Sequence, residues 1–228
     1  MKIEPRKRKA QVRDPDATQA RILVAATQEF AKHGLGGARV DRIAARAKSN
    51  KRMLYHYFGN KDELFRITVE NAYAQFRNAE TALQLDNVEP VAAVRRLVAF
   101  TWEYFLQNPE FITLVNSENL HKAKHLKASK ATPDISRKFV GRMQALLLRG
   151  EKAGVFRKGL DPVQVNISIA AIGYYYLTNR YTAAIVFERE MMSKAALAAR
   201  LKFNTDTVLR MLCTSAEIAK LEASGGLN

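Results

Sequence analysis

The stretch KSNKRMLYHYFGNKDEL, residues 48–64, sets three aromatic residues and a histidine in one run, shortly after a lysine–arginine pair. Asn50 is a residue type that caps helix N-termini, so we expect a short helix that starts there and ends at Phe58. The Gly-Asn pair that follows breaks the helix, and a new helix is expected to begin at Lys61. Rings and positive charge are therefore crowded onto one short helix.

The faces of this short helix differ in chemistry. At 100° per residue, Leu54 and Phe58 fall on one face and form a narrow apolar stripe. Arg52 and His56 fall opposite it, with rings and a methionine on the flanks. A small local core would explain the apolar stripe and part of Tyr57, but not the cations beside it. The distribution is typical of a recognition helix that enters the major groove of DNA.

Three neighbouring segments supply the expected DNA contacts. Lys51 or Arg52 can reach the acceptors of guanine, and the exposed rings can touch phosphate or the thymine methyl group. Lys61 adds its charge to the positive end of the helix that it begins, which favours phosphate. The candidate DNA-binding residues are Arg39, Arg42, Lys51, Arg52, Met53, Tyr55, His56, Tyr57 and Lys61.

Two further helices are expected upstream. Apolar residues recur at helical spacing from Thr18 to His33, and Gly34 stands where a helix end favours a left-handed residue. A second short helix is expected at 40–47, and a tight turn joins it to the recognition helix in a helix-turn-helix arrangement. The GLGGA stretch at 34–38 lacks the preceding strand and the third glycine of a dinucleotide-binding loop.

The charge of the chain points to a polyanionic partner. The 228 residues carry a formal net charge of +15, and 47% of them are apolar. Residues 1–66 hold 16 Lys and Arg against seven Asp and Glu, so positive charge is densest there. Residues 1–17, with the run RKRK, are expected to form a disordered basic arm. Double-stranded DNA fits this distribution, and a generally basic, solvated surface is the alternative.

Other features bear on compartment and cofactors. The single cysteine, Cys213, allows no disulfide within the chain and no thiolate metal cage, and we expect a small buried apolar residue there. No apolar signal region follows the basic first residues, so a cytoplasmic location is expected. The uncharged run at 163–179 is at the short limit for crossing a membrane, and a buried helix explains it better. We expect no cofactor and no membrane partner.

The segments ILVAATQEFAKHGLGGARVDRIAARA and SNKRMLYHYFGNKDELF resemble the tetracycline-repressor (TetR) family of bacterial transcription regulators, over about residues 18–66. The resemblance assigns DNA contact to the recognition helix and to the lysine after it. Lys48 stands at a position that is usually glycine in the family, so a positive φ is expected there. Ala38 and Arg39 replace the family's usual hydroxyl pair, and Arg39 is expected to substitute charge for a lost phosphate contact.

The chain is expected to be all-α. An N-terminal three-helix helix-turn-helix DNA-binding domain at 18–66 is followed by a larger helical domain at 67–228, to which the resemblance assigns ligand binding and dimerisation. The helix that begins at Lys61 is expected to run to about Leu85. Further helices are expected at 89–109, 110–129, 135–154 and 161–187, and from 193 toward the end of the chain.

A dimer is expected from the geometry of DNA. One recognition helix contacts only a few base pairs, and two-fold pairing sets two such helices about one turn of B-DNA apart, ~34 Å. The resemblance implies pairing through the last two helices. The apolar segments 161–187 and 193–213 are the best candidates for the interface, and a wholly internal core is the alternative.

The larger domain is expected to hold a mostly apolar effector pocket with a few polar anchors. The candidate ligand-binding residues are Trp102, Phe105, Asn116, Asn119, His121 and Tyr175. A plain hydrophobic core explains most of them equally well. Glu118, His121 and His125 would share one helix face, as metal ligands can, but the lysines between them disfavour a bound cation. A polar surface or a contact to an anionic ligand is expected there instead.

Together these patterns predict a ligand-responsive dimeric regulator, expected to be a repressor, that binds a palindromic operator and is released by a small-molecule inducer. Ligand and DNA would then weaken each other's binding. A non-specific architectural DNA-binding protein is the alternative, although the large helical domain would then have no function. An enzyme is disfavoured, because the chain has no nucleophile elbow, zinc-protease pattern or paired cysteines.

Overall fold

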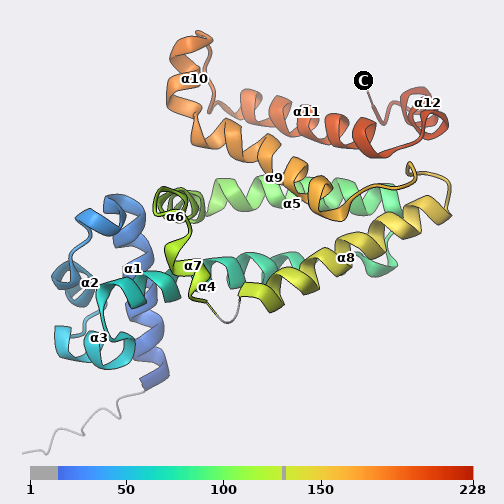
Figure 1. The fold of residues 1–228 in the computed structure, drawn as a ribbon. Coiled ribbons are helices and arrows are strands. Elements are labelled where there is room, and N and C mark those ends of the chain that lie inside the picture. The colour runs from blue at the N-terminus through green and yellow to red at the C-terminus, as the bar shows by residue number, and fades with distance from the viewer. Residues whose placement is uncertain (1–14, 130–131, 228) are drawn as a thin grey trace, which may run out of the picture. The chain divides into compact units, whose positions relative to one another are not determined.

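The structure is a computed structural model that describes residues 15–129 and 132–227 of the chain. Within these residues the named elements are all helices, so the all-α class that the sequence predicted is confirmed (Figure 1). The chain divides into two compact units after Thr68, which lies inside helix α4 (Lys61–Thr81). Each unit is described by itself.

The first unit contains α1 (Pro15–Gly37), α2 (Val40–Arg46), α3 (Lys51–Phe58) and the beginning of α4. Helix α1 begins three residues before the expected Thr18, with a proline at a position that suits a first helical turn. The rest of the expected basic arm, residues 1–14, lies outside the described residues. Gly34 has a φ of 63° and a ψ of 175° inside α1, so the helix is interrupted where the sequence predicted its end.

A small apolar core joins the elements of the first unit. Its fully buried side chains include Ile22, Phe30, Ile43, Leu54, Leu64 and Phe65. The rings of Phe30 and Phe65 meet edge to face with their centroids 5.1 Å apart. Such a pair contributes about 0.5–1.5 kcal/mol beyond the burial of its surface. Every helix of the unit places a side chain in this core, and α2 packs against both α1 and α3.

The second unit is built around α5 (Pro90–Gln107), which packs against α8, α9 and α11. Its other elements are η1 (Leu85–Asn87), α6 (Pro109–Leu120), α7 (Lys124–Lys127), α8 (Thr132–Lys152), α9 (Pro162–Thr178), α10 (Arg180–Val186), α11 (Lys194–Leu212) and α12 (Ser215–Ala223). The carboxylates of Glu89 and Asp161 cap α5 and α9, each directly before a proline. An acidic cap followed by proline satisfies free N–H groups and presets the first turn, so both starts follow from local sequence.

Four of the expected helices are shorter than predicted. The one expected from 193 toward the end of the chain ends at Leu212, and extended Cys213 and Thr214 separate it from α12. Helix α4 ends at Thr81 rather than near Leu85. The expected helix at 110–129 breaks after α6, because Lys122 and Ala123 adopt a left-handed backbone with φ of 56°. The expected helix at 161–187 breaks at Asn179, whose side-chain amide donates to the carbonyl of a residue four positions earlier. Helical periodicity continues across each of these positions, so the pattern alone did not show the breaks.

The core of the second unit is apolar and continuous. Side chains from α5, α8, α9 and α11 pack together in it, and Leu209 and Leu212 are fully buried. Cys213 is a free thiol in this core, as expected, and burial raises its pKa to about 11. A thiol with so high a pKa remains protonated near neutral pH and is unreactive. A second cluster of stacked and edge-to-face rings surrounds Phe76.

Candidate nucleic-acid interface

The turn between α2 and α3 places the predicted recognition helix. Lys48 adopts a φ of 49°, so the positive φ that the family resemblance implied at this position is confirmed. The side chain of Asn50 caps α3 and accepts a hydrogen bond of 2.9 Å from the N–H of Met53. Nε of Arg21, on α1, donates to the carbonyl of Ala47 at the end of α2. A left-handed residue, a cap and one contact to α1 together set the direction of α3.

The two sides of α3 differ as the helical wheel predicted. Leu54 and Phe58 are buried against the rest of the unit, while Arg52, Tyr55 and His56 are exposed. The six exposed candidates for DNA contact are Arg39, Arg42, Lys51, Arg52, Tyr55 and His56. The three half-buried candidates are Met53, Tyr57 and Lys61. All nine therefore reach the surface of the first unit, and their contact with DNA stays a prediction.

A buried acid, which the sequence analysis did not single out, organises the cations of α2. Glu29 on α1 is fully buried. Its Oε1 accepts hydrogen bonds from the backbone N–H of Arg39 at 3.0 Å and from Nε of Arg42 at 2.6 Å, and Nη1 of Arg46 lies 3.7 Å from Oε2. The sequence did contain a signal for this buried acid. Glu29 precedes Phe30 on the apolar side of an amphipathic helix, where a carboxylate needs a partner.

The electrostatics of Glu29 favour its charged form. Burial alone would raise the pKa of this carboxyl, but the hydrogen bonds from Arg42 and from the backbone of Arg39, with the charges of Arg42 and His33, hold its pKa below the ordinary value. The guanidinium of Arg42 also donates to the carbonyl of Gly37. Arg42 is thus engaged within the fold, whereas the backbone of Arg39 is held and its side chain remains exposed.

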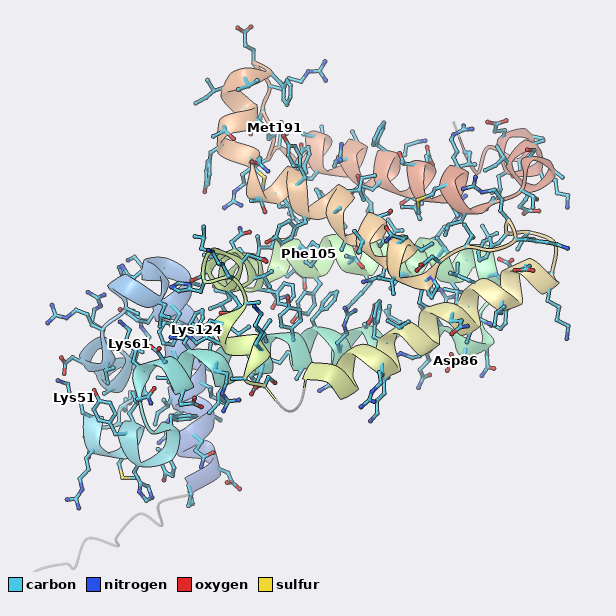
Figure 2. All side chains as sticks on the ribbon, in the orientation of Figure 1. Lys51, Lys61, Asp86, Phe105, Lys124 and Met191 are labelled. Atoms are coloured by element: carbon cyan, nitrogen blue, oxygen red, sulfur yellow. The ribbon has the colours of Figure 1, made fainter. Side chains whose placement is uncertain are left out.

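The two lysines that begin α3 and α4, labelled in Figure 2, already have partners within the first unit. Nζ of Lys51 lies 2.5 Å from a carboxylate oxygen of Asp41, and Nζ of Lys61 donates to the carbonyl of Gly36 at 3.3 Å. Both side chains of the Lys51–Asp41 pair are about half exposed, and pairs of this kind contribute only about 0–1 kcal/mol. These contacts can therefore be exchanged for phosphate at small cost.

The six predicted ligand-binding residues differ in burial and are not brought together in the cavity beside α8 or in that between α9, α10 and α11. Trp102 and Phe105 are buried in the packed interior, where Figure 2 shows Phe105 among the side chains of the second unit. Asn116 accepts a hydrogen bond from the hydroxyl of Tyr174. The side chains of Asn119, His121 and Tyr175 are exposed. The plain hydrophobic core that the sequence left open as an alternative accounts for Trp102 and Phe105.

Glu118 and His125 do not lie on the polar surface that the sequence predicted, because both side chains are buried. Nδ1 of His125 lies 2.7 Å from Oε2 of Glu118, and the N–H groups of His125 and Leu126 donate to Oε1 of the same carboxylate. The left-handed break after α6 brings the start of α7 back over Glu118, which a continuous helix would not do. Among the described residues, no group of three or more His, Cys, Asp or Glu side chains is arranged to hold a metal ion.

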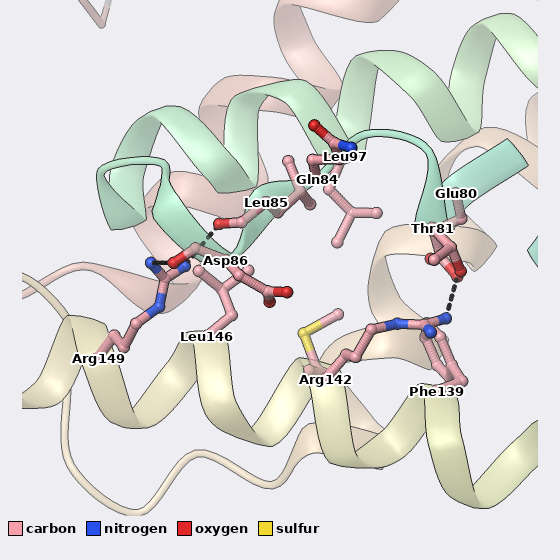
Figure 3. Close-up of a pocket in the computed structure, with 11 residues that line it drawn as sticks. Glu80, Thr81, Gln84, Leu85, Asp86, Leu97, Phe139, Arg142, Leu146 and Arg149 are labelled. Atoms are coloured by element: carbon pink, nitrogen blue, oxygen red, sulfur yellow. Dashed lines mark hydrogen bonds and ion pairs between the residues drawn. The ribbon is translucent and has the colours of Figure 1, made fainter.

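A small cavity of about 70 Å³ lies between α4, η1, α5 and α8 (Figure 3). Arg149 donates to the carbonyls of Leu85 and Val88 beside it, and Nη2 of Arg142 lies 4.0 Å from Oε2 of Glu80. Burial raises the pKa of Glu80, against the lowering effect of Arg77 and Arg142. Ligand pockets usually measure about 300–1,000 Å³, so this cavity is too small for an effector of ordinary size.

A larger cavity of about 680 Å³ lies between α9, α10 and α11. Tyr175 lines it, and it is the one predicted ligand-binding residue that does so. Within the described ranges, no helix combines the length and the apolar character needed to cross a bilayer.

Two family models match the chain. The model described as "Bacterial regulatory proteins, tetR family" matches residues 22–66. The model described as "Tetracyclin repressor-like, C-terminal domain" matches residues 90–208. The first match contains α2, α3 and the Glu29 cluster, and the second contains the cavity between α9, α10 and α11.

Known proteins resemble the chain over half or most of its length. The HTH-type transcriptional repressor NicS of Pseudomonas putida is 37% identical over 210 residues, which cover 92% of this chain and 99% of that protein. The HTH-type transcriptional repressor SCO4008 of Streptomyces coelicolor is 40% identical over 108 residues, or 47% of this chain and 53% of that protein. A solved structure described as the molecular basis for control of antibiotic production by bacterial hormones shares the fold, with a TM-score of 0.64 and 21% identity over 89% of this chain and 100% of that chain.

Proposed function

Because this chain belongs to the TetR family of bacterial transcriptional regulators, we propose that it represses transcription by binding a palindromic operator as a homodimer, and that a small-molecule effector releases it. It is a regulator rather than an enzyme. The observation that carries the proposal is the exposed side of α3, where Arg52 and His56 face away from the buried Leu54. A regulator of this kind acts on chromosomal DNA, so we place its action in the cytoplasm.

Base contacts come from α3 and backbone contacts from its surroundings. Arg52 can donate two hydrogen bonds to guanine in the major groove, which selects sequence. Lys61, at the start of α4, and Arg39, before α2, can pair with phosphates and fix the register of the protein on the duplex. The buried Glu29 holds the start of α2 and so supports the arrangement from the interior of the unit.

Dimerisation is supported by apolar side chains on the surface of the second unit. Val163, Ile167 and Tyr175 recur at multiples of four residues along one side of α9, and all three are exposed. Phe203 on α11 is 57% exposed. Exposed apolar side chains grouped in this way favour a contact with another protein. Two-fold symmetry lets the patch pair with the same patch on a second copy. We propose that this face of α9 and α11 forms the dimer interface.

The relatives support repression of transcription. NicS and SCO4008 are named as transcriptional repressors. In our proposal the effector binds the second unit and favours a conformer that holds the two DNA-binding units at the wrong spacing. The effector then lowers operator affinity, and operator DNA lowers effector affinity by the same factor.

The test is to select an operator from random duplexes and to measure its binding in competition with bulk DNA. A repressor of the proposed kind prefers one palindrome over bulk DNA by about 10³-fold or more. The alternative, a non-specific architectural protein, shows little preference for any duplex. Equal affinity for selected and random DNA would therefore exclude the proposed function.

A further inference from the structure

The cavity between α9, α10 and α11 has the size and walls of a ligand site. Its volume of about 680 Å³ falls within the range of small-molecule pockets. The rings of Tyr175, Tyr176, Phe187 and Phe203 line it. Met191, marked in Figure 2 on the segment between α10 and α11, also lines it, and the hydroxyl of Tyr176 donates to the Met191 carbonyl at 2.7 Å.

One cation in this cavity is incompletely satisfied. Nη2 of Arg200 donates to the carbonyl of Ile172 at 2.8 Å, but its Nε is buried and has no acceptor among the described residues. Within the same residues, no carboxylate lies within 4.0 Å of the Arg200 guanidinium, although Glu190 contributes to the cavity lining. The guanidinium carbon lies 5.2 Å from the ring centroids of both Tyr176 and Phe203.

An anionic ligand would stabilise the partly buried charge of Arg200. Burial lowers the pKa of Arg200, which reports the loss of solvation, yet an arginine keeps its charge near neutral pH. A charge that is partly withdrawn from water is stabilised by a counter-charge with hydrogen-bonding capacity. Carboxylates fit a guanidinium with two parallel hydrogen bonds, and the aromatic walls suit an apolar body attached to that carboxylate.

We propose that the cavity between α9, α10 and α11 binds a small organic carboxylate with an apolar body, held by Arg200 and packed against the surrounding rings. The proposal rests on the proposed function, since it names the chemical class of the effector. Tyr175 and Phe203 also belong to the face that we propose for dimerisation. A ligand in the cavity would therefore lie at the seam between two protomers, where it can change how they pair.

The test uses the full-length protein without DNA and phenylacetate as the probe. Phenylacetamide has nearly the same shape but no charge. Titration calorimetry is run with both compounds on wild type, on Arg200→Gln and on Arg200→Lys. The matched control is Lys202→Gln, which removes the same charge from the exposed side of α11, where Lys202 pairs with Asp206 outside the cavity. Circular dichroism and thermal melts establish that each variant is folded.

We expect saturable phenylacetate binding to wild type and to Lys202→Gln, with phenylacetamide about tenfold weaker or more. Arg200→Gln should lose about tenfold or more in phenylacetate affinity and no longer prefer the acid to the amide. Arg200→Lys should keep part of this preference, because it retains the charge without the planar fork.

Three results would overturn the proposal. One is equal phenylacetate affinity for wild type and Arg200→Gln, and another is no saturable binding to wild type at millimolar probe. The third is a dimer that dissociates in Arg200→Gln, since Arg200 would then meet an acid of the second copy. All three are independent of operator selection, so a failed anion site and a failed repressor function are distinguishable.

Discussion

The cations of the first unit differ in what already holds each of them. Arg42 donates to the buried Glu29 and to a backbone carbonyl, so its guanidinium is part of the fold. Arg52 makes no ion pair or hydrogen bond with any residue in the described ranges, and its side chain is exposed. We therefore expect Arg52 to select bases and Arg42 to act by holding α2 in position.

Substitution of Arg52 and of Lys61 should separate base selection from phosphate contact. Arg52→Ala should weaken operator binding by about 1–3 kcal/mol and relax base choice at one position. Lys61→Ala should weaken binding to all duplexes alike and lower the salt slope by about one. Fluorescence anisotropy with the operator and with single-base variants, at several salt concentrations, measures both effects. Unchanged binding in both variants would contradict the assignment of α3.

The charge of Glu29 should make the stability of the first unit depend on pH. The pKa of Glu29 is lowered in the folded protein, so its stabilising effect is present above the unfolded pKa, about 4.3. That effect is lost as the pH falls through the folded pKa. Glu29→Gln should lower the free energy of unfolding by about 1–3 kcal/mol at pH 7 and flatten its dependence on pH below about 5.

Urea unfolding at pH 7, 5 and 3 measures this difference. The control is Glu63→Gln, since Glu63 pairs with Arg66 on the surface of the same unit. An i,i+3 surface pair contributes only about 0.2–0.5 kcal/mol. Equal losses in the two variants would show that the cluster around Glu29 does not stabilise the unit.

The helices owe their ends to particular residues. Asn50, Glu89 and Asp161 cap the helices that follow them, each over two or three residues, and the cap at Asn50 was predicted from the sequence. The break between α6 and α7 is different. There the carboxylate of Glu118 binds two N–H groups seven and eight residues further on, so the break depends on a contact that helical periodicity does not encode.

Gly150 in α8 should be intolerant of a side chain, because a Cβ there would lie 1.9 Å from the ring of Phe156. Gly150→Ala should destabilise the second unit by about 1–3 kcal/mol, although alanine favours a helix by about 1 kcal/mol. Gly141→Ala in the same helix is the matched control, since no heavy atom lies within 4 Å of its added Cβ. It should stabilise the protein by about 0.5–1 kcal/mol. Denaturant unfolding compares the two, and a stabilised Gly150→Ala would rule out close ring packing.

At the scale of the whole molecule, binding of an operator with two-fold symmetry depends on how two protein chains pair. The apolar side of α9 is exposed in a single chain, and burying it against a second copy removes that surface from water. The larger cavity opens beside this side and shares Tyr175 with it. Pairing and effector binding are therefore expected to influence each other.

A charge placed on this face should separate the protomers. Ile167 is 51% exposed on α9, so Ile167→Asp should leave the single chain folded and make it monomeric at micromolar concentration. Operator affinity should fall with it, because one recognition helix then binds one half-site. Leu120→Asp is the control, since Leu120 is 84% exposed at the end of α6. Sedimentation equilibrium measures both, and a dimeric Ile167→Asp would refute the proposed interface.

Short-range sequence patterns determined many structural features of this protein. The all-α class, the faces of α3 and the cap at Asn50 depend on periodicity and turn chemistry within a few residues, so the sequence by itself predicted them. The positive φ at Lys48 was implied by the family resemblance. The family resemblance rests on the same segment.

Only the tertiary structure decided which polar groups meet. Glu29 and Arg42 lie 13 positions apart in the chain, and Arg200 and the carbonyl of Ile172 lie 28 apart. Their pairing depends on how α1 packs against α2 and α9 against α11. The structure places the predicted ligand-binding residues at different sites for the same reason. Burial and cavity walls are properties of packed helices and not of any one segment.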